Sequence, residues 1–192
     1  PGLWIQSSHW SDTSGGSGGF SVPTSSDDVY FDSSSGGGTV NVAAAANCAK
    51  LNFSGWTGIL GFSQSITAHG NIDLGTTCSF STSSNRGIFQ GGTGTLTTHG
   101  RNLTFRIGVS AGGALTLLDD LTLQYTFSMN GTSFDMNGHN VNANGSQATF
   151  STGTSYLRTG TLNVAGLFVV LPTATINAGT CLLYTSDAAD DT

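Results

Sequence analysis

The chain contains no glutamate and a single lysine, and charged residues make up only 8% of its 192 positions. An ordinary soluble domain is about 25% charged. Because glutamate and lysine are among the residues that favour helix surfaces, an α-rich fold is disfavoured. Five cationic residues dispersed over the chain cannot form the basic patch that nucleic-acid binding requires. No apolar run approaches the roughly 18 residues of a membrane-spanning helix, so we expect no membrane insertion.

Small residues take the place of the missing charge. Glycine, threonine, serine and asparagine occupy 28, 27, 25 and 13 positions, which is nearly half of the chain. Glycine follows no three-residue period, which excludes collagen. Hydrophobic residues at 37% and aromatic residues at 9% make the chain too apolar to be disordered. These values indicate one elongated all-β domain that is long enough to bury a core.

The two ends of the chain need separate treatment. Residues Cys181 to Asp190 match the translation of a sequencing adapter, so we interpret residues 181–192 as an adapter-derived tail that adds nothing to stability. The chain opens without an initiator methionine or a signal segment, so we expect a fragment of a longer reading frame. Three of the eleven aspartates lie in the tail, so the net charge of the remainder is −3 rather than −6. The cysteines left, Cys48 and Cys78, fit either a disulfide or two buried free thiols.

Apolar residues alternate with small polar ones from Val40 onward, which is the period of a β-strand. In the segment 115–123, two Leu-Thr-Leu strands are separated by a short polar corner. Such short strands suit a coil in which each turn pairs in parallel with the turns above and below. We therefore expect a parallel β-solenoid over 47–180, preceded by a Gly/Ser-rich entry and cap segment over 1–46. An antiparallel β-sandwich with Asn-Gly hairpins is the alternative.

The Leu-Thr-Leu pair gives the fold a specific test. Its four leucines should be buried and its two threonines exposed; these residues are Leu115, Leu117, Leu121, Leu123, Thr116 and Thr122. A recurring turn motif supports the solenoid: His69-Gly70, His99-Gly100 and Asn137-Gly138 each follow a predicted strand and precede a new apolar residue. Their glycines lie 30 and 38 residues apart, within the range of solenoid repeats.

Several stretches together resemble uncharacterised β-solenoid surface repeat proteins of phage and environmental bacteria, which are similar to tail fibres or adhesins. The resemblance covers most of residues 9–166, and it rests on 9–11, 22–32, 39–42, 48–53, 114–123 and 131–141. It implies a right-handed parallel β-helix in a virion appendage or a cell-surface adhesin. Its motifs describe turns and strands, so no catalytic residues are carried over.

Candidate catalytic residues are few. Asp119 and Asp120 could form the carboxylate pair of a polysaccharide-degrading enzyme, with His99 and Arg101 from a neighbouring turn as support. Aspartate is also favoured at strand corners for turn reasons alone. Adjacent strand residues point to opposite faces, so we expect this pair to be part of the corner.

Metal and cofactor sites are equally weakly indicated. Asp27, Asp28 and Asp32 could bind Ca²⁺, although a turn that enters a strand explains them as well. The four histidines, His9, His69, His99 and His139, lack zinc-ligand spacing. We expect neither a metal ion nor a cofactor.

Two binding functions remain. Thr93-Gly94-Thr95-Leu96-Thr97 and Thr173-Ala174-Thr175 resemble the threonine rows of ice-binding solenoids. Arg106, Asp135 and Asn163 interrupt the pattern elsewhere, so ice binding is a minor alternative. A glycan could be held by hydroxyl and amide side chains with an aromatic platform. The candidates for that platform are Trp56, Tyr125 and Tyr156, which core packing also explains.

These observations favour a non-enzymatic structural or adhesive segment located outside the cell or on a virion. We expect weak glycan binding and self-association as a homo-oligomer. A polysaccharide hydrolase or lyase is the alternative function.

Overall fold

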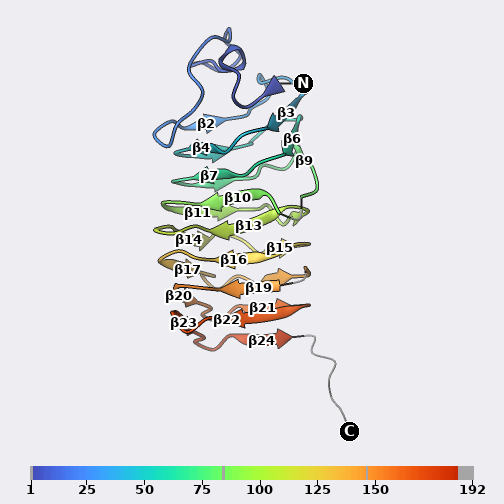
Figure 1. Ribbon diagram of the computed structural model, residues 1–192. Helices are drawn as coiled ribbons and strands as arrows, with labels where there is room; N and C mark the ends of the chain where they lie inside the picture. The colour runs from blue at the N-terminus through green and yellow to red at the C-terminus, as the bar shows by residue number, and fades with distance from the viewer. Residues whose placement is uncertain (1, 84, 146, 186–192) are drawn as a thin grey trace.

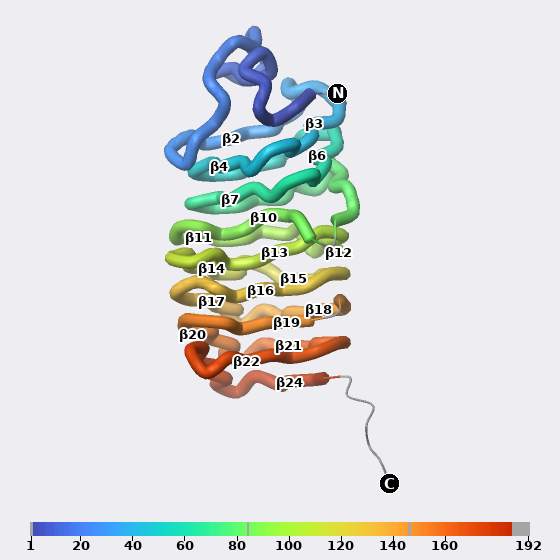
Figure 2. Tube along the Cα trace, viewed as in Figure 1, coloured from blue at the N-terminus to red at the C-terminus, as the bar shows by residue number. Residues whose placement is uncertain are grey.

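The computed structural model describes residues 2–83, 85–145 and 147–185, which wind into a stack of coils along one axis (Figures 1 and 2). One short 3₁₀ turn, η1 (Ser7–His9), precedes the coils. Every strand pair among the described residues is parallel. The predicted parallel β-solenoid is confirmed, and the sandwich alternative is wrong.

Each coil contributes one strand to each of three faces. Sheet B forms one face from β2 (Val29–Tyr30), β5 (Leu51–Asn52), β8 (Ile72–Asp73), β11 (Thr93–Thr97), β14 (Ala114–Leu117), β17 (Ser133–Asp135), β20 (Gly153–Tyr156) and β23 (Ala174–Asn177). Sheet C forms the second from β4 (Ala46–Cys48), β7 (Ile66–Ala68), β10 (Gly87–Gln90), β13 (Arg106–Val109), β16 (Phe127–Met129), β19 (Gln147–Phe150) and β22 (Leu167–Val170).

The third face is divided into two sheets. Sheet A holds β1 (Gly2–Leu3), β3 (Thr39–Val42), β6 (Ile59–Phe62) and β9 (Ser79–Phe80). Sheet D holds β12 (Asn102–Leu103), β15 (Leu121–Leu123), β18 (Val141–Ala143), β21 (Thr161–Val164) and β24 (Leu182–Thr185). The two sheets are joined by aromatic packing, because the Phe80 ring lies 4.9 Å from the Phe105 ring.

The coil length corrects the repeat suggested by the sequence. In sheet C, Ile88 pairs with Ile66 and with Ile107, and such partners are 19 to 22 residues apart throughout the sheet. His99-Gly100 and Asn137-Gly138 occupy the same corner two coils apart, between sheets B and D, whereas His69-Gly70 lies between sheets C and B. The similar turn motifs spaced by 30 and 38 residues therefore come from two different corners of the coil, and their spacing is not the repeat length.

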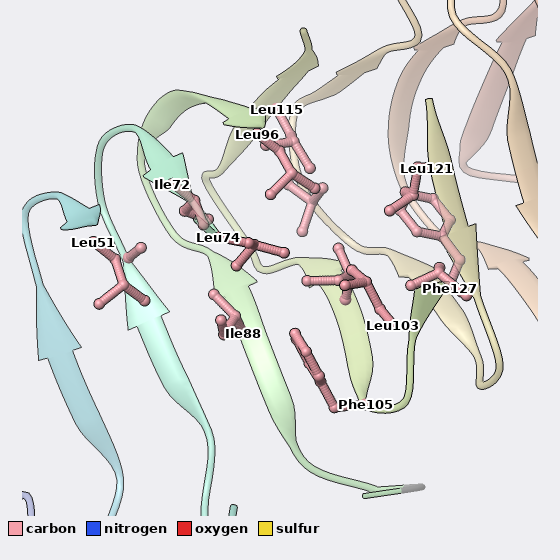
Figure 3. Packing of buried hydrophobic residues seen from close by; sticks show 14 of the residues in the cluster. Leu51, Ile72, Leu74, Ile88, Leu96, Leu103, Phe105, Leu115, Leu121 and Phe127 are labelled. Atoms are coloured by element: carbon pink, nitrogen blue, oxygen red, sulfur yellow. The ribbon is translucent and has the colours of Figure 1, made fainter. Parts of the chain in front are cut away.

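The core is a continuous column of apolar side chains inside the coils (Figure 3). Leu115, Leu117, Leu121 and Leu123 are at most 2% exposed, as predicted. Thr116 and Thr122 are half-buried rather than exposed. On a stacked face, the outward row of each strand is flanked by the rows of the coils above and below, and this contact shields the threonines.

Glycines line the corner between sheets C and B. A Cβ atom added to Gly92, Gly113, Gly131 or Gly153 would lie 2.2 to 2.4 Å from a backbone oxygen of the preceding coil. These four positions, called the glycine corner below, let successive coils approach more closely than a side chain permits. These glycines are spaced by about one coil, and no motif in the sequence identified them in advance.

The segment before the first complete coil packs as an aromatic cap. Trp4 is 1% exposed, and its ring centroid lies 4.9 Å from that of Trp10 and 6.1 Å from that of Phe31. β1 pairs with β3, and β2 pairs with β5, so parallel pairing already begins within the predicted entry and cap segment 1–46.

Three further findings complete the fold. Cys48 and Cys78 are buried free thiols, and burial raises the pKa of Cys48 to about 12.

β24 crosses the boundary expected at residue 180: Leu182 to Thr185 pair with β21, but all four side chains are exposed. The rest of the predicted adapter-derived tail, 186–192, lies outside the described residues. No helix within the described residues is long and apolar enough to cross a membrane.

Candidate functional site

The predicted carboxylate pair lies at the corner between β14 and β15, on the edge where sheet B meets sheet D. The Asp119 carboxylate accepts hydrogen bonds from the backbone amides of Thr98, at 2.8 Å, and His99. His99 has a positive φ of 56°. Asp119 therefore satisfies two amide groups of a strained turn in the preceding coil.

Asp120 faces the following coil instead. Its Oδ1 accepts a hydrogen bond from the Asn140 backbone amide at 2.8 Å, and its Oδ2 accepts one from Asn140 Nδ2 at 3.1 Å. The backbone hydrogen bond from Asn140 is the main reason why the pKa of Asp120 is lowered. His139 Nδ1 lies 3.7 Å from Asp120 Oδ1. The two adjacent carboxylates thus accept hydrogen bonds from opposite neighbouring coils.

The two supporting residues are also engaged elsewhere. His99 Nε2 lies 2.8 Å from Asp73 Oδ1, on the coil before it. The Arg101 guanidinium donates to the carbonyl oxygens of Leu74, Gly75 and Cys78, and it lies 4.8 Å from the centroid of the Phe80 ring. Arg101 therefore holds the irregular end of sheet A, close to its junction with sheet D.

Glycoside hydrolysis needs an acid and a second carboxylate on either side of one bond, and the acid needs a raised pKa. The corner offers carboxylates that accept backbone amides in two different coils, and the pKa of Asp120 moves down. This geometry matches turn stabilisation, in which carboxylates cap backbone donors. All four predicted residues lie near one corner, yet no contact joins their functional groups into one constellation.

The Asp73–His99 and Asp120–His139 contacts each join two neighbouring coils, and a third such pair involves Asp135 of sheet B. The Arg158 guanidinium donates to both carboxylate oxygens of Asp135, and this is the main reason why the pKa of Asp135 is lowered. Asp73–His99, Asp120–His139 and Asp135–Arg158 form a ladder of side-chain contacts that joins neighbouring coils. Sequence reasoning missed it, because its partners are 19 to 26 residues apart; only the coil length could have revealed them.

The ladder predicts acid sensitivity. Because the folded-state pKa values of Asp120 and Asp135 are lowered, their stabilising contribution is complete above the ordinary carboxyl pKa of about 3.9. It is lost as the pH falls below that value. Asp135→Asn should lower the midpoint of thermal unfolding at pH 7 by about 2–4 °C, as expected for roughly 1 kcal/mol. It should also flatten the decrease between pH 5 and pH 2.

Circular dichroism melts over that pH range provide the measurement. Asp12→Asn is the matched control, because the Asp12 carboxylate is exposed and makes no hydrogen bond with the described residues. A pH profile that Asp135→Asn leaves unchanged would show that the ladder does not contribute to stability.

The predicted metal candidates make separate contacts. Asp27 accepts hydrogen bonds from Thr24, Asp28 pairs with Lys50 at 2.8 Å, and Asp32 accepts hydrogen bonds from Ser14, Ser34 and Ser35. The hydrogen bonds from Thr24 and from Ser14 are the main causes of the lowered pKa values of Asp27 and Asp32. Among the described residues, no three His, Cys or Asp side chains are grouped to hold a metal ion.

A cavity of about 910 Å³ lies within the N-terminal cap. Aromatic side chains of Trp10, Phe20 and Tyr30 contribute to its lining. Four aspartates are among its lining residues as well: Asp12, Asp27, Asp28 and Asp32. Its lining residues therefore include acidic and aromatic side chains but no lysine or arginine.

The predicted aromatic platforms occupy different environments. Trp56 is 1% exposed, and its indole N–H donates to the Gly36 carbonyl at 2.7 Å, so it belongs to the core. Tyr125 is half-buried. Tyr156 is exposed on sheet B, where the Arg158 guanidinium lies 5.8 Å from its ring centroid. Of the three, Tyr156 alone presents an accessible ring.

The threonine rows are short. Thr95 pairs with Thr116 in register, and the same outward row continues as Asp135, Tyr156 and Asn177. The ice-binding alternative needs matching threonines on successive coils, and this row offers two.

No family model, no curated protein and no solved structure shows a match to this chain.

Proposed function

We propose that the chain is a non-enzymatic structural and adhesive segment of a virion appendage or of an extracellular surface protein, and that it binds glycans weakly. One observation carries the non-enzymatic part. The two candidate catalytic carboxylates, Asp119 and Asp120, accept backbone amides of opposite neighbouring coils. Carboxylates used in this way stabilise corners and leave no paired acid and base for hydrolysis.

The adhesive part is supported by the outer faces. Their rows carry hydroxyl and amide side chains with few charges, such as Thr67, Ser128 and Thr149 on sheet C and Thr95 and Thr116 on sheet B. Such groups donate and accept hydrogen bonds with sugar hydroxyls.

The test combines binding and cleavage. The protein is incubated with a panel of neutral and acidic polysaccharides, and retention in affinity electrophoresis is compared with the release of reducing ends. We expect retention on at least one polysaccharide and cleavage of none. Cleavage that Asp119→Asn or Asp120→Asn abolishes would establish the polysaccharide-degrading alternative, and retention on no polysaccharide would refute the adhesive function.

A further inference from the structure

The charged side chains are divided between the faces of the solenoid. From β8 onward, every aspartate of the described residues lies on sheet B or at the corner where it meets sheet D; these are Asp73, Asp119, Asp120 and Asp135. The outward side chains of sheet C include none. That face instead carries Arg106, and Arg86 directly precedes β10. Within a chain of net negative charge, sheet C is therefore the face that attracts anions.

The five cationic side chains differ in how they are used. Lys50 and Arg158 pair with Asp28 and Asp135, and Arg101 donates to backbone carbonyls. Arg86 and Arg106 have no such partner: within the described part of the chain, neither side chain contacts a carboxylate or donates a hydrogen bond. They lie on adjacent coils, since the Arg106 backbone amide donates to the Arg86 carbonyl at 3.2 Å.

Arg106 is held in place by an aromatic ring. Its guanidinium carbon lies 5.5 Å from the centroid of the Phe89 ring, and its Nε is buried without a hydrogen-bond partner. Gly108 permits this arrangement, because a Cβ there would lie 2.8 Å from the Phe89 ring. A guanidinium that is fixed in this way and lacks an acceptor is prepared to bind an anionic group.

The same row provides groups that suit a sugar. Register places Thr67, Phe89, Gly108 and Ser128 side by side on successive strands, with the side chains of Thr67, Phe89 and Ser128 on the outer face. Phe89 offers apolar surface to a sugar ring, while the hydroxyls of Thr67 and Ser128 flank it.

We propose that the outer face of sheet C around Phe89 and Arg106 binds an acidic saccharide, in which a carboxylate or sulfate contacts Arg106 and a sugar ring packs beside Phe89. The inference rests on the proposed glycan-binding function and gives it a site and a ligand class. The other two candidate surfaces are unsuited to this ligand. The cap cavity is lined by four aspartates, and Tyr156 lies beside Asp135 and its partner Arg158.

Isothermal titration calorimetry with defined tetrasaccharides tests the proposal. The probes are tetragalacturonate, its methyl ester, a sulfated galactan tetrasaccharide and neutral galactotetraose. We expect tetragalacturonate or the sulfated galactan, or both, to bind, and the comparison between them identifies the preferred anion. The methyl ester should bind at least tenfold more weakly than tetragalacturonate if the carboxylate is the preferred anion. Affinity for the preferred anion should fall as salt rises from 50 to 300 mM, since salt screens exposed charges.

Variants locate the contact. Arg106→Gln should weaken binding of the acidic probe by about tenfold or more, the scale of a charge-assisted hydrogen bond. Phe89→Ala should weaken binding of the same probe. Arg158→Gln removes the same charge from sheet B and is the matched control, with affinity expected to stay within twofold. Arg86→Gln changes an exposed side chain that makes no hydrogen bond or ion pair with the described residues, so it tests the same face with little risk to folding, and a weaker affinity is expected.

The outcomes separate this site from the general function. Equal losses in Arg106→Gln and Arg158→Gln, or unchanged affinity in Arg106→Gln and Arg86→Gln, would overturn the site. Preferential binding of neutral galactotetraose would also overturn it, while leaving glycan adhesion intact. A loss caused by Tyr30→Ala but not by Arg106→Gln would move the site to the cap cavity. Binding of no saccharide, here or in the polysaccharide panel, would refute both proposals.

Discussion

Replacing Phe134 with alanine is expected to lower the free energy of unfolding by about 3–5 kcal/mol, the range for fully buried phenylalanines. Phe134 is 0% exposed in the centre of the stack, and its ring centroid lies 4.7 Å from that of Phe127. Its neighbours on adjacent strands are Leu115 and Ser155. Because Ser155 is small, the next coil has little side chain with which to fill the cavity, so we expect a loss near the upper end of this range.

Tyr156→Ala is the matched control, since it removes an aromatic ring from the outer face of the neighbouring strand. The Tyr156 side chain is 36% exposed, and we expect a loss below about 1 kcal/mol. Urea denaturation followed by circular dichroism measures both variants. Tryptophan fluorescence adds a local probe, because Trp4, Trp10 and Trp56 all lie near the cap. Equal losses in the two variants would contradict the described orientation of sheet B.

Gly113→Ala should destabilise the protein by about 3 kcal/mol, at or above the upper end of typical overpacking effects. Gly113 is buried in the glycine corner, and an added Cβ would lie 2.3 Å from the Gln90 carbonyl oxygen of the preceding coil. The obstacle is backbone rather than a flexible side chain, so two coils must separate. The Gly113 carbonyl also accepts hydrogen bonds from the backbone amide and hydroxyl of Thr132, which the separation would weaken.

Gly38→Ala provides the comparison, because a Cβ at Gly38 would meet no atom within 4 Å. We expect its stability to match that of the parent or to rise slightly through a less flexible unfolded chain. The midpoints of thermal unfolding of the two variants, measured side by side, test this prediction. If Gly113→Ala were as stable as Gly38→Ala, the close approach of coils at the glycine corner would be refuted.

The architecture was accessible from sequence because it follows from local rules. Alternation in Leu115 to Leu123 places one row inward, and a polar corner between short strands favours coils. The length of the coil was not accessible, because His69-Gly70 and His99-Gly100 look alike although they lie at different corners. A turn motif records backbone conformation, and more than one corner of a coil needs the same conformation.

The candidate site was less accessible for a related reason. Adjacent acidic residues such as Asp119 and Asp120 attract attention in a sequence, but their hydrogen-bond partners lie one coil away. The isolated state of Arg106 could not be inferred either. It depends on Phe89 being in register with Gly108 and on the absence of aspartate from a whole face, and both are properties of stacking.

The short coil length has a consequence for folding kinetics. Strand partners within sheet C are 19 to 22 residues apart, about one tenth of the chain. A sequence separation of this size lies close to the relative contact orders of helical bundles and below those of β-sandwiches, which fold slowly because distant segments must meet first. Here each new coil closes a loop of about 20 residues onto a surface that is already formed. The chain can therefore wind outward from any stable pair of coils, so it should fold faster than its all-β composition suggests.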